Sequence, residues 1–487
     1  MLFNSYAYLV FLPVVLALYY AVPARFSRHV LLGASLFFYL SWNVGYGLLL
    51  LLTLTSTYAA AIAIEDGRGK RRLWLAAGIG VSLLLLFIFK YADFALRLGA
   101  GLLSLFRPGT AAPRLGLLLP VGISFYTFQA IGYVVDVYRG QTRAERSFVT
   151  YALFVSFFPQ LVAGPIERSG HLLSQVRKRR VPSFLEVQEG LLLLLWGYFL
   201  KIVVADRLAV FVDTAYGDMD AFPGVYLMVA TAFFAFQIYC DFYGYSVIAA
   251  GSARLLGIRL MENFKSPYLC SSVAEFWRHW HISLTGWFRD YLYIPLGGNR
   301  RGRGRKLVNL LIVFAVSGLW HGAEITFVIW GVLNGLYQIA GEVSAPARRR
   351  VRQLLGLPEE SLGRRIWGVA VTFVLVCISW VFFRADNLEQ AMHAFRSMGT
   401  FNPWVLFNGG LAACGLDERS LGLVWACLLV VLGCDLAGRR GIRVREVILA
   451  QSWLFRVLFG VLAVTAILLF GLYGPQYHAE NFIYFQF

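Results

Sequence analysis

Residues 2–22 have the sequence LFNSYAYLVFLPVVLALYYAV and contain no charged side chain. A helix needs about 20 mostly apolar residues to cross the hydrocarbon core of a bilayer, so this stretch predicts a membrane span. Similar charge-free runs occupy residues 115–135, 147–166, 221–240, 366–383 and 457–477. Shorter or interrupted runs follow Trp74, Gly190, Leu307 and Leu421. These repeated runs predict an all-α polytopic membrane protein.

One further charge-free stretch, residues 30–64, is too long for a single simple span. Asn43, Gly45 and Gly47 are expected to divide it into two helices. Taken together, the runs predict about 11 transmembrane helices, give or take about two, plus re-entrant segments. No polar stretch is long enough to form a soluble domain, so we expect a single membrane domain over residues 1–487.

The composition supports the same class of protein. Hydrophobic residues make up 59% of the chain and charged residues only 15%, whereas soluble domains carry about a quarter charged residues. The net charge of +17 resides in short loops between spans, which is the positive-inside pattern of membrane proteins and not a nucleic-acid surface. The first apolar run lacks a basic leader and an obvious cleavage site, so we interpret it as a span.

The basic loops set the predicted orientation. Five clusters are assigned to the cytoplasm, at residues 68–72, 177–180, 300–306, 348–350 and 439–445. One apolar run follows the last cluster, so the carboxyl-terminal tail, FIYFQF at 482–487, is predicted to lie outside. Residues 384–420 would then form the longest outer loop. His321 lies 14 residues after Leu307, which is about 21 Å along a helix and within a hydrocarbon core of about 30 Å.

His321 lies in the sequence SGLWHGA, residues 317–323. An ionisable residue at bilayer depth is a functional candidate by default. A neutral imidazole can take the proton of a hydroxyl that attacks a thioester. Gly318 and Gly322 favour this function, since glycine permits close approach of a substrate to the backbone. The alternative is a structural histidine that is hydrogen-bonded in the protein interior.

A second candidate site lies at residues 275–295, EFWRHWHISLTGWFRDYLYIP. Tryptophan and arginine together suit a pocket for an anionic, planar ligand such as an acyl-nucleotide thioester. The alternative is a structural amphipathic helix in the membrane interface. His279 and His281 would point to nearly opposite faces of one helix, and metal-binding motifs such as HExxH and CxxC are absent from the sequence. We therefore expect no metal, and we interpret the six cysteines as small apolar residues.

Several charged residues interrupt apolar sequence, and some of them should pair to lower the cost of burial. They are Lys90, Asp93, Asp136, Lys201, Asp206, Arg207, Asp241 and Glu262. Buried charges would also serve a transporter-like scaffold. A transporter predicts internal repeats with paired broken helices, and the sequence shows no such repeat.

With both histidine motifs identified, the chain resembles the membrane-bound O-acyltransferase family. The resemblance is to its bacterial branch, which contains the alginate O-acetylation membrane subunit, with the teichoic-acid D-alanylation protein as a more distant relative. The motifs that carry it are LPVGISFYTFQAIGYVVDVYRG at 119–140, FFPQLVAGPIERSGHLL at 157–173, GYFLKIVVADRLA at 197–209, QIYCDFYGYS at 237–246, EFWRHWHISLTGWFRDYLYIPLGGNR at 275–300, SGLWHGA at 317–323 and SWVFFRA at 379–385. They give a motif-rich core at about 119–345, followed by carboxyl-terminal helices and a tail at 366–487.

The resemblance implies a helical ring around a central tunnel, with His321 as the catalytic histidine and His281 supporting it. It implies transfer of an acetyl group from cytoplasmic acetyl-CoA across a bacterial inner membrane, for O-acetylation of an exported polysaccharide such as alginate. Acetyl-CoA would be a substrate, and no cofactor is expected. The further candidates for binding the donor are Trp277, Arg278, Arg289 and Trp320.

The expected partners are the lipid bilayer, a polysaccharide biosynthesis and export complex and a periplasmic SGNH-type acetyltransferase, since the sequence has no GxSxG motif. Tyr484 in the tail is a candidate acyl relay, and its alternative is an aromatic interfacial anchor.

Three positions depart from the family pattern, namely Tyr243, Val247 and His279. These departures leave both candidate histidines intact. The open alternatives are another acyl group such as D-alanyl, another cell-wall polymer, a lipid or protein acceptor and a transporter-like scaffold.

Overall fold

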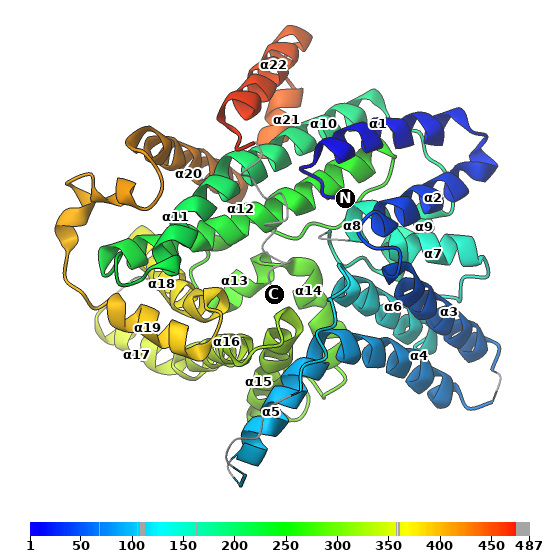
Figure 1. Ribbon diagram of the computed structural model, residues 1–487, viewed down its shortest axis with the longest axis horizontal. Coiled ribbons are helices and arrows are strands. Elements are labelled where there is room, and N and C mark those ends of the chain that lie inside the picture. The colour runs from blue at the N-terminus through cyan, green and yellow to red at the C-terminus, as the bar shows by residue number, and fades with distance from the viewer. Residues whose placement is uncertain are drawn as a thin grey trace. The chain divides into compact units, whose positions relative to one another are not determined.

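The computed structural model describes residues 1–67, 69–104, 106–107, 113–161, 164–356, 358 and 361–473. The described residues form helices and connecting loops and contain no strand, which confirms the all-α prediction. Figure 1 shows the arrangement of the helices. The relay candidate Tyr484 lies outside the described residues.

The described residues group into two compact units. The first contains Met1–Leu194 and Tyr245–Met261, and the second contains Leu195–Gly244 and the residues from Glu262 onward. The 31-residue helix α12 (Val225–Leu255) contributes its first part to the second unit and its last part to the first. The single domain predicted over residues 1–487 stays a prediction.

The first unit is built from the amino-terminal helices. They are α1 (Tyr6–Ala21), η1 (Ala24–Phe26), α2 (Ser27–Leu40), α3 (Tyr46–Glu65), α4 (Arg71–Leu86), η2 (Phe87–Tyr91), α5 (Ala92–Ser104), α6 (Ile123–Tyr138), α7 (Phe148–Ser156), α8 (Phe158–Leu161), η3 (Ser169–Leu173), α9 (Ser174–Val176) and most of α10 (Phe184–Tyr198). Helices α3, α4 and α6 lie side by side (Figure 1).

Two sequence predictions fall in this unit. The apolar stretch 30–64 is divided as predicted, because α2 ends at Leu40 and the Asn43 side chain accepts a hydrogen bond from the Gly45 backbone before α3 begins. The run 147–166 does not form one span, which corrects the prediction. The helix is interrupted at Phe157 between α7 and α8, and Pro159, two residues later, cannot donate a helical hydrogen bond.

The second unit contains both candidate histidines. Its elements are η4 (Phe199–Ala205), α11 (Asp206–Gly217), the first part of α12, η5 (Pro267–Leu269), α13 (Val273–His279), α14 (Ile282–Phe288), η6 (Arg289–Tyr293), α15 (Gly302–His321), α16 (Ile325–Val343), α17 (Ala345–Leu354), α18 (Leu362–Arg384), α19 (Leu388–Ser397), η7 (Pro403–Leu406), η8 (Gly410–Ala413), α20 (Glu418–Arg439), α21 (Val444–Leu449) and α22 (Trp453–Phe470).

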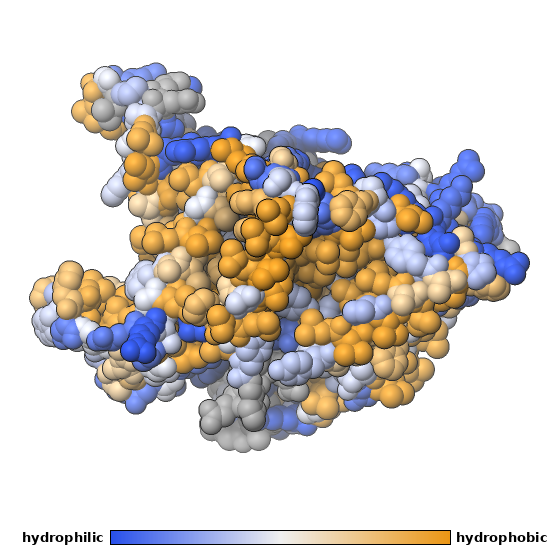
Figure 2. Space-filling view, turned by 90° about the horizontal axis from the view of Figure 1, so that it is seen from above, coloured by the Kyte–Doolittle hydropathy of each residue, from blue (hydrophilic) through white to orange (hydrophobic). Residues whose placement is uncertain are grey.

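Six helical stretches of the described chain are long and apolar enough to cross a membrane. They are Tyr46–Glu65, Arg71–Ser104, Val225–Leu255, Leu362–Arg384, Glu418–Arg439 and Trp453–Phe470. The predicted count of about 11 is therefore not confirmed. Apolar side chains cover much of the face drawn in Figure 2, and α22 buries only Ile467, as expected for a helix that faces lipid.

Some of the charges in apolar sequence pair as predicted. The Lys201 ammonium on η4 lies 2.8 Å from Asp206 Oδ1 and 2.7 Å from Asp241 Oδ1 on α12. All three side chains are almost fully buried. The pairing lowers the cost of placing charges in an apolar interior and ties η4 to the middle of α12.

Candidate active site

His321 is the last residue of α15, a 20-residue helix that begins at Gly302. The predicted helical path from Leu307 to His321 is thereby confirmed. The imidazole is 5% exposed and is surrounded by aromatic rings. Its ring centroid lies 4.9 Å from that of Trp320, 5.1 Å from that of Trp330 on α16 and 5.4 Å from that of Phe383 on α18. Three helices thus form an aromatic cage that keeps bulk water from the imidazole.

The glycines beside His321 have a different role from the predicted one. A Cβ atom at Gly318 would lie 2.2 Å from the carbonyl oxygen of Phe327, and one at Gly322 would lie 2.1 Å from the Phe327 ring. Helix α16 therefore fills the space that was expected for a substrate, and the prediction of substrate approach at these two glycines is wrong. They allow α15 and α16 to pack closely.

His281 lies in the junction between α13 and α14 with φ 42°, a left-handed conformation that is uncommon for a side chain other than glycine. It is 1% exposed, and its ring centroid lies 4.7 Å from that of Phe242 and 6.1 Å from that of Trp320. Trp320 is thus in ring contact with both histidines and brings them into one site. Burial lowers the pKa of His281 to about 3, which keeps this imidazole neutral.

The structure separates the candidates for donor binding. Trp277 is buried, lies 5.5 Å from Trp330 between ring centroids and donates from Nε1 to Asn334 Oδ1 at 3.2 Å. Arg278 is exposed and donates to a carbonyl of its own helix. Arg289 is also exposed and pairs with Asp290 at 2.8 Å. Trp277 and Trp320 belong to the histidine site, whereas no contact among the described residues brings the two arginines there. All four donor-binding roles stay predictions.

Sequence reasoning assigned no role to several residues of the site. Trp330 and Asn334 on α16 have no motif that singles them out. Phe242 and Phe383 stand within the family motifs QIYCDFYGYS and SWVFFRA, so the sequence contained a pattern that could have identified them. The alternative of a single amphipathic helix over 275–295 is wrong, since the chain forms α13, α14 and η6 with a break at Trp280 and His281.

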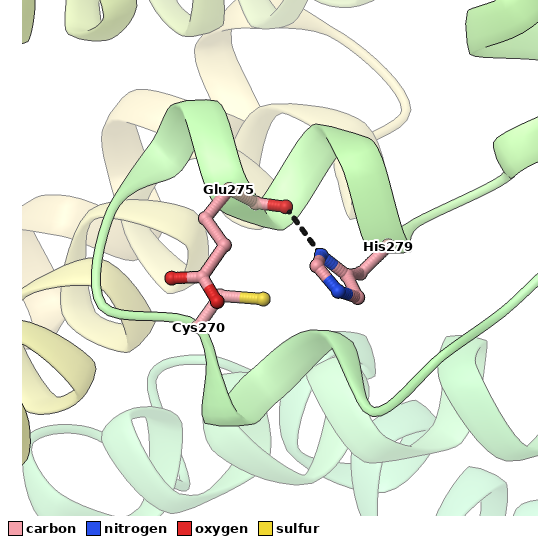
Figure 3. A group of neighbouring side chains, drawn as sticks. All are labelled: Cys270, Glu275 and His279. Atoms are coloured by element: carbon pink, nitrogen blue, oxygen red, sulfur yellow. Dashed lines mark hydrogen bonds between the residues drawn. The ribbon is translucent and has the colours of Figure 1, made fainter. Parts of the chain in front are cut away.

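Cys270, Glu275 and His279 form a mixed cluster whose potential ligand atoms all lie within 4.8 Å of one another (Figure 3). Arg439 already contacts two of them, with Nη1 2.7 Å from Glu275 Oε1 and Nη2 2.6 Å from Cys270 Sγ. A guanidinium repels a metal cation, and burial raises the pKa of the Cys270 thiol to about 12, which disfavours the thiolate that a metal needs. The cluster therefore suits an arginine better than a metal ion.

The fold and the site together define a multi-spanning membrane protein with a caged, buried pair of histidines. Comparison with known proteins then identifies the family. The sequence model of the membrane-bound O-acyltransferase family matches residues 143–354. The chain is 39% identical over 435 residues to the probable alginate O-acetylase AlgI of Pseudomonas aeruginosa. The aligned region covers 88% of this chain and 81% of that protein.

Two other relatives carry different names. The chain is 34% identical over 454 residues to the peptidoglycan O-acetyltransferase of Helicobacter pylori, covering 86% of this chain and 82% of the relative. It is 25% identical over 291 residues to the teichoic acid D-alanyltransferase of Streptococcus thermophilus, covering 55% and 68%. The chain belongs to the membrane-bound O-acyltransferase family and is an O-acyltransferase, which confirms the family resemblance and favours an enzyme over a transporter-like scaffold.

Proposed function

We propose that the protein transfers an acetyl group from cytoplasmic acetyl-CoA across the inner membrane for O-acetylation of an exported polysaccharide, with alginate as the first candidate. The observation that carries the proposal is the aromatic cage of His321, together with His281 in ring contact with Trp320 of that cage. The alginate relatives, which align over 88% of this chain, support the acetyl group and the polymer class.

In the proposed reaction, His321 acts as the general base. Its neutral imidazole takes the proton of the acceptor hydroxyl while the hydroxyl oxygen attacks the thioester carbonyl. The new C–O bond forms and the C–S bond breaks. The imidazolium then returns its proton to the leaving thiolate, so the products are an O-acetyl ester and free coenzyme A. The aromatic cage favours the transfer because it excludes water that would hydrolyse the thioester.

The neutral His281 would support this reaction from the junction of α13 and α14. Trp277 would help to shape the pocket through its contact with Trp330, which itself contacts His321. Arg278 and Arg289 are exposed, as suits cations that bind the phosphates of a donor arriving from water. In this proposal the arginines attract the donor and the buried aromatic residues hold the thioester.

The test of the proposal is His321→Ala in the full-length protein in detergent or nanodiscs. Thiol release from acetyl-CoA should fall by about 10²- to 10⁴-fold per folded protein, as expected when a general base is lost. His29→Ala is the matched control, since His29 is an exposed histidine of α2. Turnover in His321→Ala equal to that of the control would remove His321 from the mechanism.

A second candidate function is the transfer of another acyl group or the acylation of another cell-wall polymer. The similarity to the peptidoglycan O-acetyltransferase and the teichoic acid D-alanyltransferase supports it. Deletion of the gene followed by mass spectrometry of the exported polymers distinguishes the candidates. Loss of acetyl ester from a polyuronate supports alginate, and loss from muramic acid or loss of D-alanyl ester supports the alternatives.

The proposed pathway includes a periplasmic SGNH-type partner and a polysaccharide export complex, with the carboxyl terminus outside. The support for the partner is the lack of a GxSxG motif in the chain, and the support for the orientation is the distribution of basic loops. Tyr484 remains the relay candidate. Tyr484→Phe removes the phenol but keeps the ring, so loss of polymer acetylation supports the relay and full acetylation supports an anchor.

A further inference from the structure

Two residues of the described chain other than glycine have positive φ, namely Ser266 at 50° and His281 at 42°. Both lie in the segment that carries the histidine motif. A side chain in the left-handed region is strained and persists only where surrounding contacts hold it. The contacts that hold Ser266 and His281 therefore decide where the His281 imidazole points.

The backbone around His281 is held by residues 263–265. The Lys265 amide donates to the His279 carbonyl at 3.0 Å, and the Ile282 amide donates to the Asn263 carbonyl at 2.9 Å. The Ser283 hydroxyl donates to Asn263 Oδ1 at 2.6 Å. These bonds stand on both sides of His281, so any movement of residues 263–265 shifts it.

Helix α20 holds the end of that segment. The Ser266 hydroxyl donates to the Asp435 carbonyl oxygen at 3.0 Å, and Arg439 Nη2 donates to the Ser266 carbonyl oxygen at 3.4 Å. Asp435 and Arg439 are one turn apart on α20, so both contacts come from the same face of that helix. Ser266 is thereby fixed through its side chain and through its backbone.

The same two residues of α20 also contact the neighbours of His281. Arg439 pairs with Glu275 on α13 at 2.7 Å, and the Glu275 carboxylate also accepts a bond from the Ser271 amide at 2.9 Å. The Tyr239 hydroxyl donates to both carboxylate oxygens of Asp435, at 3.0 and 3.1 Å. Figure 3 shows Glu275 and His279 on α13, with Cys270 on the segment that precedes the helix.

Tyr239 in turn packs against the segment that holds His281. Its ring centroid lies 5.7 Å from that of Phe264 and 6.2 Å from that of Trp280, the residue before His281. We call the set Asp435, Arg439, Ser266, Glu275 and Tyr239 the α20 brace.

We propose that the α20 brace positions His281 for acyl transfer, with Arg439 and Ser266 as positioning residues. The proposal rests on the proposed function, because it assigns no reaction of its own. Residues 435 and 439 lie outside the stretch that the family model matches, residues 143–354. A carboxyl-terminal helix of this chain thus supports the geometry of the family's central motif.

The test compares three variants of the full-length protein. Arg439→Met removes the guanidinium, and Arg439→Lys keeps the charge but cannot reach Ser266, Glu275 and Cys270 together. Ser266→Ala removes one uncharged hydrogen bond, so of the three variants it should disturb folding least. Arg440→Met is the matched control, because Arg440 is the exposed neighbour of Arg439 on the same turn.

The measurement is thiol release from acetyl-CoA per folded protein, with kcat and KM determined separately, beside the melting temperature. We expect kcat of Arg439→Met to fall about 10-fold or more, since displacement of a catalytic group by about 1 Å can cost 10²-fold. Ser266→Ala should lower kcat less than Arg439→Met does, and Arg439→Lys should recover part of the kcat lost in Arg439→Met. The KM and the melting temperature of Ser266→Ala should stay unchanged. Values of kcat within twofold of Arg440→Met for both Arg439→Met and Ser266→Ala would overturn the proposal.

Three outcomes separate this proposal from the proposed function. If His321→Ala is inactive while the brace variants keep normal kcat, the brace fails alone. If His321→Ala keeps normal turnover, the proposed function fails. If the wild type releases no thiol from acetyl-CoA, the donor assignment fails. The same variants are then compared by the acyl ester content of the exported polymer, measured per folded protein.

Discussion

Replacement of Gly331 by alanine should separate α15 from α16 and displace His321. A Cβ atom at this position would lie 2.2 Å from the Phe314 carbonyl oxygen and 3.1 Å from Gly318 Cα. Both are backbone atoms and cannot rotate away. Ordinary contact needs about 3.4 Å, so the helices must move apart by about 1.2 Å. Overpacking of this kind costs about 1–3 kcal/mol.

The matched control is Gly341→Ala on the same helix, where a new Cβ meets no atom within 4 Å. Alanine there should stabilise α16 by up to about 1 kcal/mol, because it has a higher helix propensity than glycine. The assay is the melting temperature of the purified protein together with acyl transfer per folded protein. We expect Gly331→Ala to melt lower and to lose about 10- to 100-fold in kcat. Equal stability and activity of the two variants would refute the close packing of α15 on α16.

Two further predictions concern charges. Lys201→Met removes the cation that Asp206 and Asp241 share. The free energy of unfolding should therefore fall by about 3–5 kcal/mol, which a lower melting temperature would report. An unchanged melting temperature would contradict the buried pairing. The hydrogen bond to Glu167 raises the pKa of His171. This contact therefore contributes its full stabilisation at pH values below the ordinary pKa of histidine, and the stabilisation is lost as the pH rises through the raised pKa. Because His171 is partly exposed, the change should be about 0.2–1 kcal/mol, and His171→Gln should flatten that part of the pH profile of the melting temperature.

The sequence predicted the site in part. His321 was identified because an imidazole in apolar sequence is conspicuous, whereas the role of His281 came from the family resemblance. Trp277 and Trp320 were named because they lie in the same two histidine motifs. Trp330 was not assigned, because an aromatic residue inside an apolar helix has the same local pattern whether it faces lipid or the site. Phe383 was not assigned although it stands within the motif SWVFFRA. The role of Gly318 and Gly322 was misjudged, since the atom that fills their space belongs to another helix.

The sequence by itself determined the helical membrane class, the division of residues 30–64 and the helix that carries His321. These features depend on the length, polarity and turn residues of single segments, which are local properties of the chain. The tertiary structure alone decided that Trp320 contacts both histidines and that Arg439 reaches Glu275. Such contacts join residues far apart in the sequence, and only the packing of the helices brings them together.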